Sequence, residues 1–347
     1  MTSKVFTVRL SFAAMAVLIA LVLCFRPISS ITSSNDTGRY VKNQSQACAL
    51  PLAGGSWVTH DSTVVLNPSL IADPTASLSL RIFDWIMHPA CLGGEPRVFL
   101  FIAALPLPLS LLVFAGWNRE ATVLIACGLL GSSVGFEFMT NALRQGVALA
   151  FLLAGFASEK RFIRFIAIAL AILIHDSSWF FAPLVVVLAY RKGALTKKTL
   201  LLCSVPLLVI VLLLISSGLF STSSEMYLAL MTYTEAYSEA PSVLFLLFML
   251  CPLFFIFLIR NLERPTELSM EEPTAFWYST SLLILSMILF PYITYRFAME
   301  AVAIQAFMAT RAPNVSVRAG ITIAAGLIIN FVVYAFFSKS VISLFYA

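Results

Sequence analysis

Arg144 and Arg296 are the residues whose type and position point most directly to chemistry. Arg144 begins an apolar run that continues to Ala157, and Arg296 precedes a second apolar run. A guanidinium costs about 2.5–3.5 kcal/mol at the centre of a bilayer, and it does not lose its proton to escape that cost. Such arginines usually face a polar cavity, and they bind phosphate oxygens through two parallel hydrogen bonds. We therefore predict a clamp for an anion.

Neighbouring polar residues add to this predicted clamp. Gln145 follows Arg144 and supports it, and Tyr292 and Tyr295 supply hydroxyl donors beside Arg296. The alternative is structural, because an arginine near a helix end also extends to the membrane surface. Each arginine would otherwise pair with an acidic residue, for which the candidates are Asp176, Glu137 and Glu300.

His175 is a candidate general base, because it is the one histidine within the predicted membrane segments. A neutral imidazole accepts a proton near pH 7. Asp176 follows it and is a candidate substrate-binding residue, although successive helical residues point about 100° apart. The alternative is a buried histidine whose hydrogen bonds are satisfied within the core.

Arg26 and Asp36 form a further candidate pair on the outer side of the first apolar segment. Asp36 lies in the run Asn-Asp-Thr-Gly-Arg-Tyr, residues 35–40. Its carboxylate could orient a substrate hydroxyl or hold a clamp arginine, whereas a short Asp-x-Gly run is also a common turn.

The composition identifies the kind of protein that carries these residues. Hydrophobic residues make up 60% of the chain and charged residues 11%, against about 25% charged in soluble domains. The mean hydropathy is +0.94. The net charge of +5 comes from residues scattered through short connections, which excludes a nucleic-acid partner and indicates topology signals instead. We predict an all-α, polytopic helix bundle in a lipid bilayer, forming one domain over residues 1–347.

About 20 apolar residues cross a bilayer, and that length divides the chain into about eleven segments. All should be helical, because lipid offers no partner to unpaired backbone groups. Their expected positions are 7–25, 97–117, 121–138, 142–157, 162–175, 177–190, 199–217, 242–260, 275–293, 297–310 and 319–337. We expect the first segment, which begins after Lys4 and Arg9, to be a retained helix rather than a cleaved signal peptide.

The distribution of lysine and arginine sets the expected orientation. With a cytoplasmic N-terminus, the short inner connections hold most of the 22 basic residues, as the positive-inside rule requires. The C-terminus is then periplasmic. Arg144 and Arg296 fall on the same, outer side, together with two long loops at residues 26–96 and 218–241. The second loop carries alternating Tyr and Glu residues that suit sugar binding or an interfacial aromatic belt. Cys48 and Cys91 in the first loop could pair if that side is oxidising.

Residues 162–190 are too few for two full-length crossings. The stretch begins and ends with basic residues, His175 lies at its apex, and Pro183 is expected to interrupt the return arm. We predict two short or broken helices around a polar point, which is a common way to build a site at membrane depth.

Familiar soluble-enzyme motifs are missing from the sequence. It has no phosphate-binding glycine loop, dinucleotide fingerprint or Asp-x-Asp pair. We therefore expect neither a metal nor an organic cofactor, and we do not expect a nucleotide-activated donor.

Taken together, these motifs resemble the EpsG-like branch of the Wzy class of bacterial polysaccharide polymerases. The resemblance runs from about residue 20 to 190. It rests on Arg26, the 35–40 run and Gly94-Glu95-Pro96, then on Arg144-Gln145 within residues 141–145 and on His175-Asp176-Ser177, with Tyr295-Arg296 as a weaker echo.

The resemblance implies polymerisation of undecaprenyl-diphosphate-linked repeat units into O-antigen or exopolysaccharide at the periplasmic face of the bacterial inner membrane. Arg144 and Arg296 would hold the donor diphosphate and His175 would act as the base. Arg26, Asp36, Gln145, Asp176, Tyr292 and Tyr295 would bind substrate. A chain-length regulator is a candidate partner. Sugar, linkage and oligomeric state do not follow from the sequence.

The sequence is also compatible with other functions. An O-antigen ligase or another lipid-linked-glycan transferase would need the same clamp. A transporter or flippase would favour inverted repeats and charge across both leaflets, whereas polar residues here gather on the outer side. A membrane acyltransferase would use His175 but not the arginines.

Overall fold

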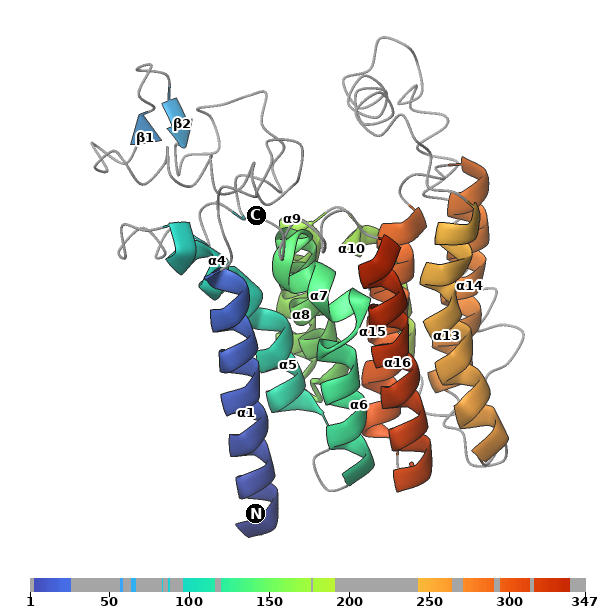
Figure 1. Ribbon diagram of the computed structural model, residues 1–347. Coiled ribbons are helices and arrows are strands. Elements are labelled where there is room, and N and C mark those ends of the chain that lie inside the picture. Colours follow the sequence, from blue (N-terminus) through green and yellow to red (C-terminus); the bar gives the residue numbers. More distant parts are fainter. Residues whose placement is uncertain are drawn as a thin grey trace.

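The computed structural model describes the chain as a helix bundle with few other elements (Figure 1). It describes residues 3–25, 57–58, 64–66, 83, 87, 96–115, 120–175, 177–190, 243–263, 271–289, 294–312 and 315–337. The helices are α1 (Ser3–Cys24), α4 (Pro96–Ala104), α5 (Pro106–Phe114), α6 (Glu120–Leu130), α7 (Ser133–Thr140), α8 (Leu143–Ala157), α9 (Arg161–Ile174), α10 (Ser178–Tyr190), α13 (Val243–Glu263), α14 (Glu271–Leu289), α15 (Thr294–Arg311) and α16 (Val317–Phe337).

The helices confirm the expected all-α bundle, to which strands β1 (Trp57–Val58) and β2 (Val64–Leu66) add a short hairpin. They pair antiparallel, with Trp57 opposite Leu66 and Val58 opposite Val64, and a register irregularity follows Trp57. This hairpin belongs to the predicted 26–96 loop. The predicted segment 199–217 and loop 218–241 lie outside the described residues, as do Cys48 and Cys91.

Two predicted single crossings are each built from two helices. A proline at the first position of α5 separates it from α4 at Leu105, where its missing N–H costs nothing. The axes of α6 and α7 differ by 57°. The Ser132 hydroxyl begins α7 by accepting a hydrogen bond from the Gly135 N–H at 3.1 Å, a typical N-cap. All eight residues of α7 are buried, so it fills the interior instead of continuing α6.

Three stretches of the described chain are long and apolar enough to cross a membrane, and the bent α6–α7 pair would add a fourth. The three are Phe6–Cys24, Arg97–Phe114 and Val317–Phe336. The predicted total of about eleven crossings and the predicted orientation of the termini remain predictions.

Contacts between helix ends define two opposite ends of the bundle. At one end, Thr122 at the start of α6 donates to Thr310 near the end of α15, and the Ser316 N–H before α16 donates to Glu263 at the end of α13. At the other end, Gln145 near the start of α8 contacts Arg296 near the start of α15. We call the first the Arg260 end, after Arg260 of α13, and the second the Arg144 end, after Arg144 of α8.

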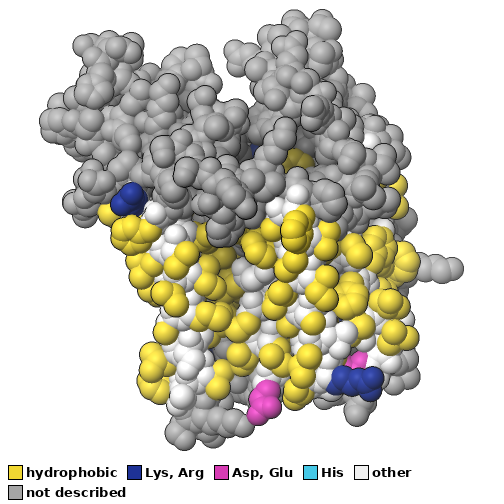
Figure 2. Space-filling model, viewed as in Figure 1, with side chains coloured by type: hydrophobic (Ala, Val, Ile, Leu, Met, Phe, Trp, Pro, Cys, Tyr) yellow, Lys and Arg dark blue, Asp and Glu magenta, His cyan; other side chains and the backbone are white. Residues whose placement is uncertain are grey.

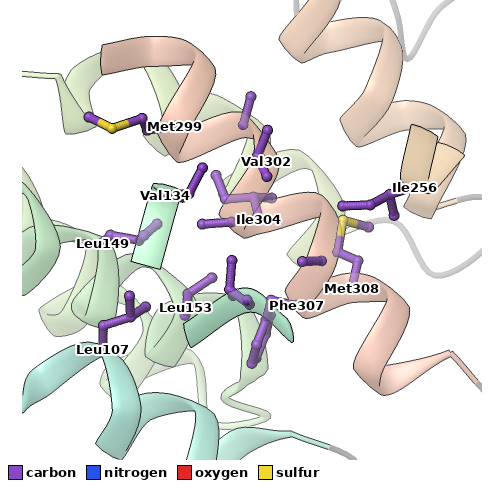
Figure 3. Packing of buried hydrophobic residues seen from close by; sticks show 14 of the residues in the cluster. Leu107, Val134, Leu149, Leu153, Ile256, Met299, Val302, Ile304, Phe307 and Met308 are labelled. Atoms are coloured by element: carbon purple, nitrogen blue, oxygen red, sulfur yellow. The ribbon is translucent and has the colours of Figure 1, made fainter. Parts of the chain in front are cut away.

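Helix α15 lies at the centre of the packing. Every residue from Phe297 to Thr310 is buried, and α15 contacts α6, α13 and α14 extensively. Figure 3 shows Met299, Val302, Ile304 and Phe307 of α15 among residues of other helices, such as Leu149 of α8. The predicted span 297–310 was therefore too short by a few residues at its start.

Helices α6 and α16 meet without intervening side chains. A Cβ at Gly128 of α6 would lie 2.7 Å from Ala324 Cα, and a Cβ at Gly320 of α16 would lie 2.8 Å from Ala121 Cα. Both distances are shorter than Cβ atoms tolerate, so only glycine permits this approach. The small-residue contact is the kind that drives helix association in lipid.

An ion cluster around the buried Arg260 and Glu272 side chains joins α13, α14 and the residue before α16 at the Arg260 end. Arg260 of α13 donates to both carboxylate oxygens of Glu272 on α14 at 3.2–3.3 Å and to Glu263 at 2.8 Å. Glu263 in turn accepts the Ser316 N–H at 2.7 Å. Arg260, Glu263, Glu272 and Ser316 are the Arg260 cluster below.

The lateral surface of the bundle is apolar. On the face shown in Figure 2, hydrophobic side chains cover the middle, and the visible charged side chains lie at the upper and lower margins. Large side chains such as Phe162 and Phe165 of α9 and Phe336 of α16 are more than 70% exposed. In water such a surface would be unstable, whereas it suits contact with acyl chains.

Candidate functional site

The α9–α10 junction confirms the predicted pair of short helices within residues 162–190. α9 ends at Ile174, and His175 adopts an extended backbone with φ −148° and ψ 131°. The chain then turns, and α10 begins at Ser178, whose N–H donates to the His175 carbonyl at 3.1 Å. The expected interruption at Pro183 is wrong, because α10 continues through that proline to Tyr190. The break lies at His175 instead.

His175 and Ser177 contact each other across this break. The Ser177 hydroxyl oxygen lies 2.7 Å from His175 Nδ1, and the Ser177 N–H lies 3.1 Å from the same nitrogen. Both residues are buried, with 7% and 6% of their surfaces exposed. Because Nδ1 is occupied within the protein, Nε2 is the ring nitrogen left to meet a substrate.

Glu300 connects this break to α8 and α15. It is fully buried, and its Oε1 accepts hydrogen bonds from the Ser177 hydroxyl and, at 2.8 Å, from Gln145 Nε2. Gln145 Nε2 also donates to the Arg296 carbonyl at 3.1 Å. These residues, Gln145, His175, Ser177, Arg296 and Glu300, are the Glu300 network below.

The two arginines lie at this network. Both are half-buried, and both interact electrostatically with His175, while Arg296 also acts on Glu300. Arg296 Nε donates to the Tyr295 hydroxyl at 2.9 Å, and its guanidinium lies 5.7 Å from the centre of that ring. Tyr295 therefore orients the Arg296 side chain. Arg144 and Arg296 do not lie on opposite flanks of the bundle.

The structure thus brings together five of the predicted residues, which are Arg144, Gln145, His175, Tyr295 and Arg296. The remaining four, Arg26, Asp36, Asp176 and Tyr292, lie outside the described residues.

From the sequence, Glu300 was only a possible counter-ion, and Ser177 belonged to the His175-Asp176-Ser177 motif without a predicted role. The available signal for Glu300 was its position as a lone acidic residue in an apolar segment, which by itself marks a functional candidate. Glu300 lies 123 positions from Ser177 and 155 positions from Gln145 in the sequence. The sequence therefore gave no indication that these residues contact one another.

Three buried oxygen atoms at the site have no hydrogen-bond partner among the described residues. They are Glu300 Oε2, Gln145 Oε1 and Ser178 Oγ. Because buried polar atoms are normally paired, these atoms are positions where a water or a substrate hydroxyl can bind. The site therefore combines two guanidinium groups, a buried imidazole and spare acceptor oxygens.

A second buried carboxylate, that of Glu137, lies on α7. It accepts hydrogen bonds from the Tyr334 hydroxyl of α16 and from Asn141 Nδ2 at 3.2–3.3 Å. Ser133 donates to Asn330 on the same pair of helices at 2.6 Å. These contacts join α7 to α16.

Comparison with known families supplies a further observation. The model of the EpsG family matches residues 69–346, which is most of the chain. The chain belongs to the EpsG family. No curated protein and no solved structure matches it.

Membership in the EpsG family confirms the resemblance found in the sequence and indicates a polysaccharide polymerase-type role. With the apolar helices, it identifies the chain as a membrane protein. The matched region contains Arg144, His175, Arg296 and Glu300, whereas Arg26 and Asp36 precede it. The described site thus lies entirely within the part of the chain that carries the family match.

Proposed function

We propose that this EpsG family member polymerises undecaprenyl-diphosphate-linked oligosaccharide repeat units into O-antigen or exopolysaccharide. It would act at the periplasmic face of the bacterial inner membrane as a multi-pass glycosyltransferase. The observation that carries the proposal is the convergence of Arg144, Arg296 and His175 from three separate helical segments on one buried polar network.

The arginines suit the donor diphosphate. Two half-buried guanidinium groups offer fixed positive charge at one end of the bundle, where the diphosphate of a lipid-linked sugar would lie. Preorganised cations aimed at a leaving group stabilise the negative charge that develops in the transition state. The arginines would supply this stabilisation without a metal ion. Gln145 would hold Arg296 in place through its carbonyl, and Tyr295 would orient the guanidinium.

His175 suits the acceptor. In the proposed step, an acceptor hydroxyl oxygen bonds to the anomeric carbon of the donor while the bond from that carbon to the diphosphate oxygen breaks. The diphosphate leaves with the bonding electrons, and the hydroxyl proton moves to the His175 imidazole. A positioned base of this kind contributes about 10²–10⁴-fold to the rate.

The remaining parts of the proposal concern groups outside the described site. Asp36 and Asp176 would bind sugar hydroxyls, and Arg26 and Tyr292 would add contacts to the phosphates. The apolar lateral surface would receive the lipid chain. The Arg144 end would face the periplasm, and a chain-length regulator is a proposed partner.

The test compares glycan chains in cells that carry Arg144→Ala, His175→Gln or the control Arg97→Ala. Arg97 is an exposed residue of α4 that lies over the Phe25 ring, 5.4 Å away, so the control removes a positive charge outside the site. We expect the first two variants to shorten chains to a single repeat, and the control to retain long chains. Protein amounts in the membrane are compared in parallel.

The pattern of loss also separates polymerase from ligase. Loss of polymerisation leaves one repeat attached to the lipopolysaccharide core, whereas loss of ligation leaves none. Unchanged long chains in Arg144→Ala and His175→Gln, at normal protein amounts, would contradict the proposed roles.

A further inference from the structure

The Gln145 amide has a defined orientation in the Glu300 network. Its nitrogen lies 3.1 Å from the Arg296 carbonyl oxygen and 2.8 Å from Glu300 Oε1. A backbone carbonyl only accepts hydrogen bonds, so the NH₂ group must be the part of the amide that faces it. The two hydrogens of that group serve Arg296 and Glu300. The amide oxygen, Gln145 Oε1, has no hydrogen-bond partner among the described residues, although Gln145 is only 1% exposed.

Two more buried oxygen atoms of the same site are without a hydrogen-bond partner in the described part of the chain. Glu300 Oε2 is the second oxygen of the carboxyl group that binds Gln145 Nε2. Ser178 Oγ belongs to the residue after Ser177, which contacts the same carboxyl group. Glu300 and Ser178 are fully buried. Leaving buried polar atoms unpaired is costly, so three of them from α8, α10 and α15 indicate that a ligand completes their hydrogen bonds.

The chemistry of these atoms excludes a phosphate oxygen as that ligand. An amide oxygen only accepts hydrogen bonds, and an ionised phosphate has no hydrogen to donate, so Gln145 Oε1 would repel it. A sugar hydroxyl both donates and accepts. It therefore suits Gln145 Oε1 and Ser178 Oγ, and it suits Glu300 Oε2 whether the carboxyl group is ionised or protonated. The N–H of an acylated amino sugar would also donate to Gln145.

The position of the three atoms relative to the arginines identifies the part of the substrate that they meet. Gln145 follows Arg144 in α8 and binds the backbone of Arg296, and Arg296 also acts electrostatically on Glu300. A group bound here lies next to the residues that hold the diphosphate. In a lipid-linked glycan, the sugar nearest to the diphosphate is the one bonded to it.

We infer that Gln145 Oε1, Glu300 Oε2 and Ser178 Oγ form a subsite for a hydrogen-donating group of the donor sugar that is bonded to the diphosphate. The inference rests on the proposed function, because that function places the diphosphate at the two arginines. The arginines accept any lipid-linked diphosphate, whereas the subsite selects the sugar. A donor with no hydrogen to offer leaves buried acceptors unpaired, and sites of this kind reject such analogues strongly.

The test measures how tightly the full-length protein binds two probes. One is undecaprenyl diphosphate, and the other is the same lipid carrying only the first sugar of the repeat unit. We expect the natural protein to bind the second probe about 10-fold more tightly, which corresponds to one or two hydrogen bonds. Calorimetry in detergent measures both dissociation constants, and we call their ratio the sugar preference.

Ser178→Ala is the sharpest variant, because the oxygen that it removes makes no hydrogen bond among the described residues. The stability of the protein, measured by SDS titration, should therefore be unchanged or slightly higher. The sugar preference should nevertheless fall by about 2–10-fold. A residue with a purely structural role would not show this combination.

Gln145→Met keeps the volume of the side chain and removes the amide, so the sugar preference should disappear. Any damage to the arginine clamp in this variant appears separately, as weaker binding of undecaprenyl diphosphate. Gln305→Met is the matched control. Gln305 is another buried glutamine of α15 whose amide atoms have no described hydrogen-bond partner, and its replacement should keep the sugar preference.

The outcomes distinguish this inference from the proposed function. Arg144→Ala should weaken the binding of both probes by the same factor, and an unchanged affinity for undecaprenyl diphosphate would overturn the clamp and with it the proposed function. If the clamp holds but the natural protein binds both probes equally, only the subsite is overturned. The same conclusion follows if the preference persists in Ser178→Ala or Gln145→Met, or if Gln305→Met also abolishes it.

Discussion

The Arg260 cluster and the Glu300 network both join separate helical segments through buried polar side chains, yet they differ in how completely their hydrogen bonds are made. In the Arg260 cluster one guanidinium meets two carboxylates, and the spare oxygen of Glu263 accepts the Ser316 N–H. In the Glu300 network, Arg296 acts on Glu300, both Arg144 and Arg296 act on His175, and oxygen atoms of Gln145 and Glu300 have no hydrogen-bond partner among the described residues.

The difference separates a structural group from a candidate site. A cluster whose hydrogen bonds are complete has no capacity for a ligand, and its residues hold helices in place. A network with spare acceptor oxygens has capacity for a hydroxyl group or a water. Perturbed and incompletely paired groups of this kind gather at functional sites. We therefore predict that substitutions in the Arg260 cluster lower the stability of the protein, and that substitutions in the Glu300 network lower the rate of turnover.

The largest expected effect is at the Arg260 cluster. Arg260→Ala leaves the buried Glu272 without its partner, which should lower the free energy of unfolding by about 3–5 kcal/mol. Unfolding by SDS titration of the purified protein measures the change. Arg318→Ala, an exposed arginine of α16 at the same end, is the control. Equal stability of the two variants would show that the cluster is not structural.

The next effect is at the clamp. Arg296→Lys keeps the charge but loses the planar fork and the contact to Tyr295. Losing one hydrogen bond to a charged group costs about 1.5–3 kcal/mol, so the rate of chain extension should fall by roughly 10–150-fold. The SDS unfolding midpoint should stay near that of the natural protein. A lower midpoint with an unchanged rate would reverse the assignment of roles.

A smaller effect is expected where the two regions are connected. Tyr278 lies on α14, the helix that carries Glu272, and its hydroxyl donates to the Phe180 carbonyl in the first turn of α10. Tyr278→Phe should cost about 0.5–1.5 kcal/mol of stability, measured by the same SDS titration. The ¹⁵N signals of His175 report whether the break also moves. A larger loss of stability would indicate that α10 depends on this contact more than on an ordinary hydrogen bond.

The smallest expected effect sharpens the contrast most. Replacing Arg260 and Glu272 together by Met and Leu removes both charges, and apolar replacements of buried ion pairs are often neutral or stabilising. We expect stability within about 1 kcal/mol of the natural protein and long glycan chains in cells. Short chains at normal protein amounts would assign the cluster a part in turnover.

The sequence predicted the helices far better than their interruptions. Apolar runs located most described helices to within a few residues, because lipid-facing composition and length determine them. The bend after Gly131 falls at Ser132 and Ser133, within the segment 121–138 that was predicted as one crossing from its length and hydropathy. Pro183 looked like a break but lies within α10, whereas His175, an ordinary polar residue, marks the true break.

The candidate site was predicted as a set of residue types and not as a set of contacts. Fixed charge at the ends of apolar runs pointed to Arg144 and Arg296, and the single histidine in a short segment pointed to His175. Glu300 was missed as a site residue because its importance comes from two hydrogen bonds to distant parts of the chain. Only packing around α15 brings those parts together.

The glycine contact between α6 and α16 has a consequence for how the protein is made. Gly128 meets Ala324, and Glu137 meets Tyr334, across about 196 positions of sequence. At a synthesis rate of about 5–20 residues per second, α6 and α7 leave the ribosome roughly 10–40 s before their partner helix exists. During that interval the Glu137 carboxylate and the α6 backbone around Gly128 are not yet covered by α16. The insertion machinery would have to keep them away from lipid. Nascent chains halted before residue 317 should therefore remain bound to a membrane chaperone or be degraded.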